Sequence, residues 1–496
     1  MGLGHFFGGL VLPGLKPSPE AARVRVLPLP SVLRVPLLQH AGLEAECCVS
    51  VGQHVARFQL LGHAPAQGFG APVHAPAAGK VIALERGAVA LPGTPEALHV
   101  LIRVDAQGPS QPMPPLNWRS TDTSLLLERI RAAGVVGMGG AGFPTGGKLS
   151  REAPLLIINA AECEPVVAAD EALVREHAND VLEAAALLSK IVGASRVVLA
   201  LEQRMAPALD ALRSAMQERP PAAELTVDVL ALPDRYPAGG ERQLIQYVTG
   251  QQLPEGSLPA DIGVAVQNVA TAVAALRAVR DGRPLVSRIV TVGGDGACGT
   301  GNFEVAIGTP AEHVGAAVGG WHSDAACLLA GGPVMGVPLP DDGVAVGKSV
   351  IALTAWRTLK QQEELPCIRC GDCATACPAR LQPQLLHAAL EAKEPARALS
   401  LGLMACIECG CCDMVCPSQI SLTAQFHNGR STERVRQFER DVADAARIRF
   451  EQRDARLQRD AAEANDAQAT RLKRNAGAAA AALAKARAKR DGAAPP

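Results

Sequence analysis

Short apolar runs alternate with turn residues in the first part of the chain. Runs rich in Val and Leu at residues 23–26, 31–37, 80–84 and 97–104 are separated by Gly and Pro. Runs of this length, bounded by turn residues, are typical of β-strands. The pattern therefore predicts an all-β domain over residues 1–110.

The apolar period changes after a Pro-rich stretch at residues 109–115. Leu125, Leu126 and Ile130 fall on one face of a predicted helix at residues 123–133. Buried strands then alternate with helices, which is typical of an α/β layer with a largely parallel sheet. The predicted strands are residues 155–159, 196–201 and 226–230, and the predicted helices are residues 170–192 and 241–249.

Three further segments follow this α/β layer. Residues 285–345 return to short β segments with Gly-rich turns, and residues 354–416 are predicted to be helical apart from two cysteine loops. The remainder is rich in Ala and Arg and has high helix propensity. The fold class is therefore multidomain, with α/β and β parts. The predicted domain boundaries are 1–110, 115–284, 285–345, 355–425 and 430–496.

Eight of the fourteen cysteines form two copies of the pattern C-x2-C-x2-C-x3-C-P. In proteins with paired motifs of this spacing, three cysteines bind one [4Fe-4S] cluster and the fourth ligates the other cluster. The sequence therefore predicts two clusters with crossed ligands. The first cluster is predicted at Cys367, Cys370, Cys373 and Cys416, and the second at Cys406, Cys409, Cys412 and Cys377.

Other roles for these cysteines fit the sequence less well. Disulfide frameworks are typical of small secreted chains, whereas this chain has 496 residues. Zinc usually takes its ligands as two separated pairs. Cys411 has no position in either motif. Free thiols alongside iron–sulfur motifs indicate a reducing cytoplasm.

Charge and composition limit the classes of partner. A net charge of −1 gives no general attraction to nucleic acid or anionic lipid, and 3% aromatic residues leave few platforms for stacking bases. The first fifteen residues lack the basic segment of a signal peptide. No apolar run is long enough to predict a transmembrane helix, so we expect any membrane association to run through partners.

A glycine-rich loop at residues 137–148 is the second chemical signal. It contains a formal G-x-G-x-x-G, but a helix precedes it where the dinucleotide fingerprint needs a strand, so a plain turn stays an alternative. Backbone N–H groups of glycine can approach a phosphate closely, and Lys148 adds a positive charge. The glycines concerned are Gly137, Gly139, Gly140 and Gly142.

Several motifs resemble known families in their residues and order. Residues 137–148 resemble the flavin-binding loop of the NADH-oxidising flavoprotein subunit of respiratory complex I. Residues 156–165 are similar to the strand and acidic turn of that subunit, and residues 236–241 to its glycine–glutamate turn. Residues 268–271 are similar to its asparagine–threonine flavin contact. Residues 51–81 resemble the barrel-sandwich hybrid of biotinyl and lipoyl carriers. With His5-Phe6-Phe7-Gly8-Gly9 and the cysteine motifs, the order resembles the C component of the Rnf (Rsx) electron-transport complex over residues 1–425.

The Rnf resemblance implies a fold and a function. It implies a barrel-sandwich-hybrid-like domain, a flavoprotein core, a β-grasp-like segment, a helical two-cluster ferredoxin domain and a partly disordered helical tail. It implies electron exchange among NADH, FMN and two [4Fe-4S] clusters, coupled to ion translocation. The partners would be integral and peripheral subunits of the same complex, with a ferredoxin-like subunit among them, at the cytoplasmic face of the bacterial inner membrane.

The resemblance also implies roles for single residues. The FMN phosphate would contact Gly137, Gly139, Gly140, Gly142 and Lys148, and the flavin would contact Asn159, Asn268 and Thr271. Gly240 and three candidate catalytic carboxylates would line the nicotinamide and ribose side, and these are Glu162, Glu164 and Glu241. The chain departs from complex I at Met138, where complex I has arginine, and at Leu149, where it has tryptophan.

Several alternatives stay open. The same motifs suit a soluble NADH:acceptor oxidoreductase, or an electron supplier that keeps a redox-sensing regulator reduced. Lys80 can be interpreted as the acylated lysine of a carrier domain, and His74 as a ligand-binding residue instead of a structural one. The tail, with Lys485 and Arg487 near its end, allows docking to anionic headgroups or to an acidic partner as well as a solvated helix.

Overall fold

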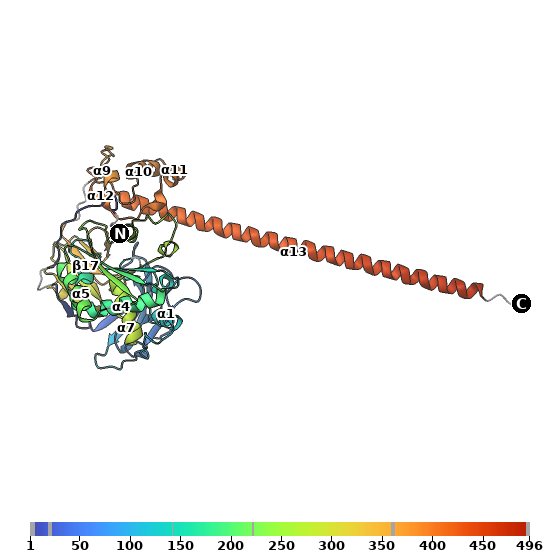
Figure 1. Ribbon diagram of the computed structural model, residues 1–496, viewed down its shortest axis with the longest axis horizontal. Coiled ribbons are helices and arrows are strands. Elements are labelled where there is room, and N and C mark those ends of the chain that lie inside the picture. The colour runs from blue at the N-terminus through green and yellow to red at the C-terminus, as the bar shows by residue number, and fades with distance from the viewer. Residues whose placement is uncertain (1–4, 18–21, 141, 221–222, 359–362, 493–496) are drawn as a thin grey trace. The chain divides into compact units, whose positions relative to one another are not determined.

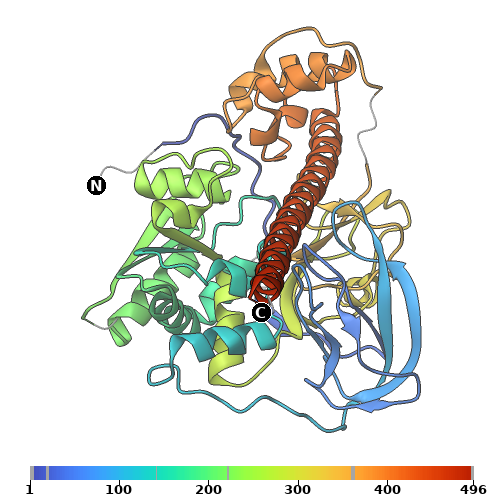
Figure 2. The ribbon, with the colours of Figure 1, turned by 90° about the vertical axis from the view of Figure 1, so that its right-hand side faces the viewer.

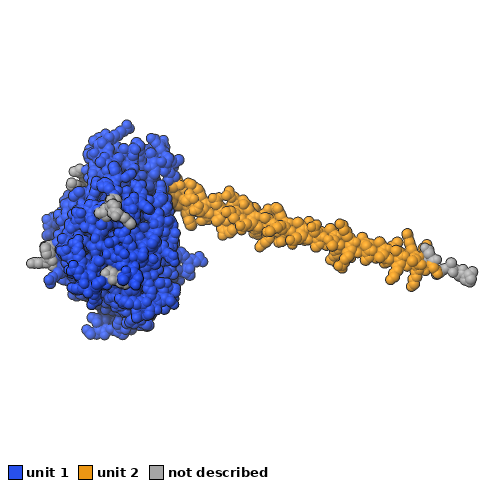
Figure 3. All heavy atoms as spheres, viewed as in Figure 1, with its two compact units in different colours: residues 1–423 blue, residues 424–496 orange. Residues whose placement is uncertain are grey.

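The computed structural model describes residues 5–17, 22–140, 142–220, 223–358 and 363–492. They form two compact units, residues 1–423 and residues 424–496 (Figures 1 and 3). The first unit holds the four β-sheets and all of the predicted site residues, so the site can be described within it alone.

Two small antiparallel sheets form the first domain, as the alternation of apolar runs and turns predicts (blue in Figure 2). One sheet has the strand order β2-β8-β7-β4 and the other has the order β3-β5-β6. Leu33, Leu61 and Ile102, which come from both sheets, are fully buried in one apolar cluster. The strands are β2 (Val32–Pro36), β3 (Glu46–Cys47), β4 (His54–Val55), β5 (Leu60–His63), β6 (Val73–His74), β7 (Gly79–Ala88) and β8 (Glu96–Val104).

A four-stranded parallel sheet with the order β11-β10-β9-β12 forms the α/β core. The chain runs outward from β9 to β11 and then returns to place β12 on the other side of β9. In open sheets of this kind, ligands bind outside the carboxyl ends of the strands at this switch point. The strands are β9 (Leu155–Asn159), β10 (Arg196–Glu202), β11 (Thr226–Leu232) and β12 (Val264–Asn268). The helices are α1 (Thr123–Ala132), α2 (Thr145–Lys148), α3 (Ala169–Glu176), α4 (Ala178–Val192), α5 (Ala206–Glu218), α6 (Glu241–Thr249), η1 (Pro259–Ile262) and α7 (Val269–Arg280).

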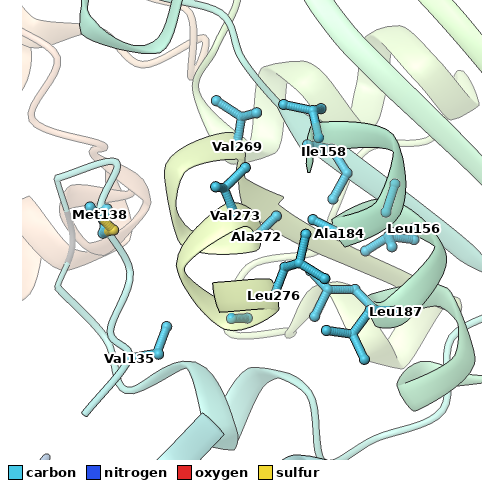
Figure 4. Close-up of a cluster of buried hydrophobic side chains, with 14 of the residues drawn as sticks. Val135, Met138, Leu156, Ile158, Ala184, Leu187, Val269, Ala272, Val273 and Leu276 are labelled. Carbon is cyan, nitrogen blue, oxygen red and sulfur yellow. The ribbon is translucent and has the colours of Figure 1, made fainter. Parts of the chain in front are cut away.

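Apolar side chains join this sheet to the helices α4 and α7 (Figure 4). Ile158 of β9, Leu187 of α4 and Leu276 of α7 are fully buried in one cluster. Met138 of the glycine loop belongs to the same cluster, so the loop is anchored to the core by an apolar side chain. Truncating one of these buried leucines to alanine costs about 2–5 kcal/mol in typical cores.

The single helix predicted at residues 170–192 is wrong, because it is two helices in the structure. His177, with φ −130° and ψ 36°, separates α3 from α4. Helix α3 packs against α5 and β13, whereas α4 packs against both α7 and α5. The local propensity favours one continuous helix, and tertiary packing overrides it.

The third domain is a six-stranded sheet with the order β1-β14-β13-β17-β15-β16. The predicted strand at residues 23–26 is confirmed, but it pairs in parallel with β14 and so completes this distant sheet. The prediction of helix at residues 354–356 is wrong, because they belong to β17, which pairs with β13 and β15. The elements are β1 (Val24–Val26), β13 (Ser287–Gly293), β14 (Gly301–Ala306), α8 (Ala311–Ala316), β15 (Cys327–Ala330), β16 (Val337–Pro338) and β17 (Ala352–Trp356).

Short helices carry and separate the two cysteine loops, as predicted. Both motifs have the same local build, because the third cysteine of each lies on a short helix. The helices are α9 (Asp372–Ala376), α10 (Pro383–Glu391), α11 (Pro395–Ser400), η2 (Leu403–Ala405) and α12 (Cys411–Met414).

One helix, α13 (Leu422–Asp491), accounts for the described part of the second unit. Its 70 residues correspond to about 105 Å at 1.5 Å per residue. Most of its side chains are exposed, and ion pairs such as Arg440–Glu433 lie along it. The structure thus has an uninterrupted helix where the sequence predicts a partly disordered helical tail. Across the described residues, none of the helices combines the length and the apolar character needed to span a bilayer.

Candidate functional site

Asn159 and Asn268 end two neighbouring strands at the switch point of the parallel sheet. They lie opposite each other in the register of β9 and β12. The Asn268 side chain caps α7, because its Oδ1 accepts the N–H groups of Ala270 and Thr271 at 3.0 and 3.2 Å. The Asn159 Nδ2 donates to the Gly239 carbonyl at 2.8 Å. Two predicted flavin contacts therefore lie side by side at the edge where such sheets bind nucleotides.

The glycine-rich loop contacts the first turn of α7. The Met138 N–H donates to the Thr271 Oγ1 at 2.8 Å, and a Cβ on Gly139 would lie only 3.1 Å from the Cβ of Asn268. Gly140 has φ 116°, which favours glycine, and no described atom lies within 4 Å of the position of its missing Cβ. Exposed backbone without side chains is thus present next to the two asparagines.

The other two predicted glycines close the loop. The Gly137 N–H donates to the Phe143 carbonyl at 2.8 Å. The Gly142 carbonyl accepts the N–H of Ala41 at 3.0 Å, which ties the loop to the N-terminal domain. Ala141, within the same predicted loop, lies outside the described residues.

Lys148 and Glu241 form an ion pair beside this loop. The Lys148 Nζ lies 2.7 Å from the Glu241 Oε2, and the two side chains are 36% and 38% exposed. Lys148 ends α2, and Glu241 starts α6 directly after its N-cap residue Gly240. Exposed pairs of this kind contribute about 0–1 kcal/mol, so a bound phosphate could displace the carboxylate at little cost. The structure therefore brings together predicted residues from four separate segments.

Glu162 and Glu164 are held by backbone N–H groups. The Glu162 carboxylate accepts the N–H groups of Asp170 and Glu171, both at 2.9 Å, at the start of α3. The Glu164 carboxylate accepts the N–H groups of Val334 and Met335 at 2.9 and 3.1 Å. Burial raises the pKa of Glu164, and these two bonds act in the opposite direction. Both carboxylates have clear structural roles, and their contact with a nicotinamide ribose stays a prediction.

A buried polar network behind the loop was not predicted from the sequence. Asp170 is buried, and its carboxylate accepts a hydrogen bond from the Asn268 Nδ2. The pKa of Asp170 is raised to about 7, because burial and then the nearby Glu162 raise it by more than the Asn268 bond and the charge of Arg288 lower it. The Arg288 guanidinium donates to the carbonyl of Met138, the same loop residue that binds Thr271. The network therefore supports the glycine loop through its backbone at Met138.

Lys348 extends this network to three domains. Its Nζ donates to the carbonyls of Pro72 and Gly134 at 2.9 and 2.8 Å, and its own carbonyl accepts a hydrogen bond from Arg288. Burial lowers the pKa of Lys348 to about 7. The one signal of this network in the sequence is a charged residue within an otherwise apolar strand. That residue is Arg288, near the start of β13.

The first cysteine motif shares a hollow with one cysteine of the second motif. Cys367, Cys370 and Cys373 line it, and Cys416 lines it too, with Pro417 and Ser418. This is the set predicted to bind the first cluster. Four thiols around one hollow fit a [4Fe-4S] cluster, which is held by four cysteines.

The last cysteine of the first motif lies beside the second motif. Burial raises the pKa of the Cys377 thiol, and the neighbouring Cys409 thiol raises it further. The Leu381 N–H donates to the Cys377 Sγ and the Glu408 N–H to the Cys406 Sγ, both at 3.4 Å. Hydrogen bonds to sulfur are one of the means by which proteins tune cluster potentials.

The two cysteine loops follow the same backbone path. Arg369 and Gly371 flank the second cysteine of the first motif with φ of 58° and 87°, and Glu408 and Gly410 flank that of the second with φ of 54° and 73°. Backbone of this kind turns N–H groups into the loop and favours a bound anion. Within the described residues, no three Cys, His, Asp or Glu side chains surround a point where a single metal ion would bind.

Three residues with alternative interpretations have ordinary structural surroundings. Lys80 lies within β7, opposite His54 and Arg103, and not at a hairpin tip. His74 is buried in β6, where burial and then the charge of Lys348 lower its pKa to about 3. Cys411 is fully buried in an apolar cluster.

Comparisons with known proteins bear on the fold. Residues 130–277 match the family described as the Nuo51 FMN-binding domain, and residues 4–107 match the RnfC barrel sandwich hybrid domain. The predicted first domain and the predicted flavoprotein core are therefore confirmed at the level of the fold.

Whole-chain relatives share one description, the C component (RnfC) of an ion-translocating oxidoreductase complex. The protein of Edwardsiella ictaluri is 40% identical over 473 residues, covering 93% of this chain and 58% of that protein. The protein of Pseudomonas aeruginosa is 42% identical over 465 residues (92% and 59%), and that of Salmonella arizonae is 40% identical over 466 residues (92% and 68%). The chain thus spans less than two thirds of the first two relatives. A solved NAD+-reducing [NiFe]-hydrogenase chain is 20% identical with a TM-score of 0.45, over 63% of this chain and 66% of that chain, which is too distant to inform function.

Proposed function

Because the chain belongs to the RnfC family of ion-translocating oxidoreductase complexes, we propose that it is the electron-transfer subunit of such a complex. It exchanges electrons among NADH, FMN and two [4Fe-4S] clusters, and partner subunits couple this transfer to ion movement. Those partners are integral and peripheral membrane subunits, with a ferredoxin-like protein among them. The protein itself lies at the cytoplasmic face of the bacterial inner membrane.

The residues at the switch point fit FMN. The exposed amides of Gly139 and Gly140 and the ammonium of Lys148 would hold the phosphate, and Asn159 and Asn268 would contact the flavin. When bound, FMN supplies the conversion of a two-electron hydride into single electrons. The protein contributes a preformed site, because Asn268 is already fixed by its cap on α7.

Thr271 and the carboxylates would act by positioning other groups of the site, in addition to any direct contact with FMN or NADH. The Thr271 hydroxyl holds the loop at Met138, so it would position the glycines. Glu241 holds Lys148 until a phosphate replaces it. Glu162 and Glu164 shape the acidic turn, and binding of the nicotinamide ribose by this turn is part of the proposal.

The cysteine loops fit the two clusters, with Cys416 and Cys377 exchanged between the motifs. The observation that carries the proposal is the position of Cys416 in the hollow of the first motif. A zinc site built from one motif needs no ligand from the other, whereas paired [4Fe-4S] clusters do. Assignment of residues 355–425 to a ferredoxin domain and of residues 285–345 to a β-grasp-like domain belongs to the same proposal.

Metal and flavin analysis of protein purified without oxygen tests the proposal. Two [4Fe-4S] clusters would give about eight iron and eight sulfide per chain, with extractable FMN beside them. Zinc, or no metal, at these thiols would contradict it. Copurification with integral membrane subunits would distinguish a member of a complex from an oxidoreductase that works alone.

A further inference from the structure

We propose that Tyr236 is a positioning residue that holds the second cysteine motif against the candidate flavin site. The second cluster, with the ligands Cys377, Cys406, Cys409 and Cys412, is then the one that exchanges electrons with the flavin directly. This inference rests on the proposed function and adds the order of the two clusters and the residue that fixes it.

The Tyr236 side chain connects two segments that are far apart in the sequence. Its hydroxyl donates to the carbonyl of Cys409 at 2.7 Å, and only 3% of the residue is exposed. Three residues later in the same turn, the Gly239 carbonyl accepts the Asn159 amide at the switch point. One short turn therefore contacts a predicted cluster ligand at one end and a predicted flavin contact at the other.

The N-terminal segment provides a second connection to the same cluster. Leu10 and Tyr236 exchange two backbone hydrogen bonds of 2.8 and 2.7 Å, and the Gly9 N–H donates to the Ala376 carbonyl at 2.8 Å. Gly8, with φ 65°, lies so close that an added Cβ would be 2.6 Å from the Cys377 carbonyl oxygen. Cys377 and Cys409 come from different motifs but are predicted ligands of the same cluster, and both are tied to Tyr236.

The apolar packing agrees with these bonds. Tyr236, Ala238, Ala376, Cys409 and Cys411 belong to one apolar cluster. The turn that holds Tyr236 and Gly239 and the second cysteine loop therefore share an apolar core as well as a hydrogen bond. This sharing makes their separation rigid, as electron transfer between two fixed groups requires.

The first motif has different surroundings. Cys367 and Cys370 are exposed, and the hollow of the first cluster is lined, among the described residues, by residues 367–371, 373, 384, 416–418, 420 and 422. Those lining residues all belong to the cysteine segment itself. The first cluster is therefore the outer one, and the second lies between it and the flavin.

Tyr236→Phe removes the hydroxyl and keeps the ring. It leaves the buried Cys409 carbonyl without its donor, and loss of such a bond raises local opening by about tenfold. In full-length protein purified without oxygen, we expect both clusters and the flavin to be retained. The midpoint potential of the second cluster should shift while that of the first stays unchanged, and electron transfer from reduced flavin to the clusters should slow.

The two cluster signals are assigned by electron paramagnetic resonance with Cys412→Ala and Cys373→Ala. Tyr247→Phe is the matched control, because Tyr247 is the other tyrosine of the chain and packs at the edge of the same apolar cluster. It should leave both potentials and the transfer rate unchanged. Equal potentials in Tyr236→Phe and the parent protein, or a shift confined to the first cluster, would overturn the inference.

A second variant keeps the hydroxyl and tests the other connection. Gly8→Ala should disturb the same second cluster through the Cys377 carbonyl. If Tyr236→Phe unfolds and loses its flavin, this variant tests instead whether the second cluster is the one connected to the flavin site. A parent protein without clusters would instead contradict the proposed function, so the two failures are distinguishable. Intact clusters and flavin with an insensitive second cluster would contradict the role of Tyr236 alone.

Discussion

Replacing Thr271 by valine removes one hydrogen-bond acceptor and almost no volume. Thr271 is fully buried in the first turn of α7, and its Oγ1 accepts the Met138 N–H at 2.8 Å. Met138 is itself only 3% exposed, so water does not easily replace the lost partner. The substitution therefore tests whether this single bond holds the glycine loop in place.

The size of the effect follows from the cost of an unpaired buried donor. Leaving such an N–H group without an acceptor costs about 1–3 kcal/mol, which corresponds to an increase of about five- to 150-fold in the open fraction of the loop. The apolar contacts of Met138 remain, so we expect local opening and not unfolding of the α/β core. FMN affinity should fall as well, because the binding-competent loop is less populated.

Hydrogen exchange measured by mass spectrometry can detect this opening without FMN. Peptides that cover residues 136–144 should exchange faster in Thr271→Val by the factor given above, whereas peptides from β7 in the N-terminal domain should not change. Thr271→Ser keeps the hydroxyl and loses a methyl group, so it should protect the loop more than valine does. The reasoning is refuted if valine leaves the exchange of residues 136–144 unchanged, or if serine accelerates it as much as valine.

Three further predictions follow from the same structure. Cys416→Ala should remove the cluster signal that Cys373→Ala also removes, and loss of the other signal would show that the ligands are not crossed. Lys148→Ala should weaken FMN binding while iron content stays constant, with Lys148→Arg retaining most of the affinity, and equal FMN affinities in all three proteins would exclude Lys148 from the site. Burial lowers the pKa of Lys348 from 10.5 to about 7, so the unfolded chain takes up this proton first and stability is lost as pH falls from about 10.5 to 7. Lys348→Met should therefore lose less thermal stability than the parent protein between pH 9.5 and pH 7, and an equal loss in both would contradict this account.

Much of the α/β core was predictable because its signals are local. The bounds of β9 and α6 agree with the predicted residues 155–159 and 241–249, since both elements are short and sharply bounded in their apolar pattern. The break at His177 was not predictable, because it depends on which surfaces α3 and α4 cover. The strand β17 was missed for a related reason, since its partners β13 and β15 lie far away in the sequence.

In the candidate site, too, features with local signals were predictable and features that depend on distant contacts were not. Motif spacing alone predicts which cysteines are exchanged. Cys416 lines the same hollow as the first motif, and the exchange of ligands between the motifs stays a prediction. The structural tasks of Glu162 and Glu164 are invisible in the sequence, because they depend on backbone N–H groups from other segments. The support of the loop by Arg288 likewise needs a contact between residues 150 positions apart.

The pairing of β1 with β14 has a consequence for synthesis on the ribosome. Val24–Val26 is made long before its partner Gly301–Ala306, which emerges roughly 280 residues later, after about 15–55 s at typical translation rates. During that interval the nascent chain carries an edge segment with no neighbour to bind. The sheet built from β13, β14 and β17 can therefore gain β1 only after these later strands have emerged, when a segment made much earlier returns to pair at its margin.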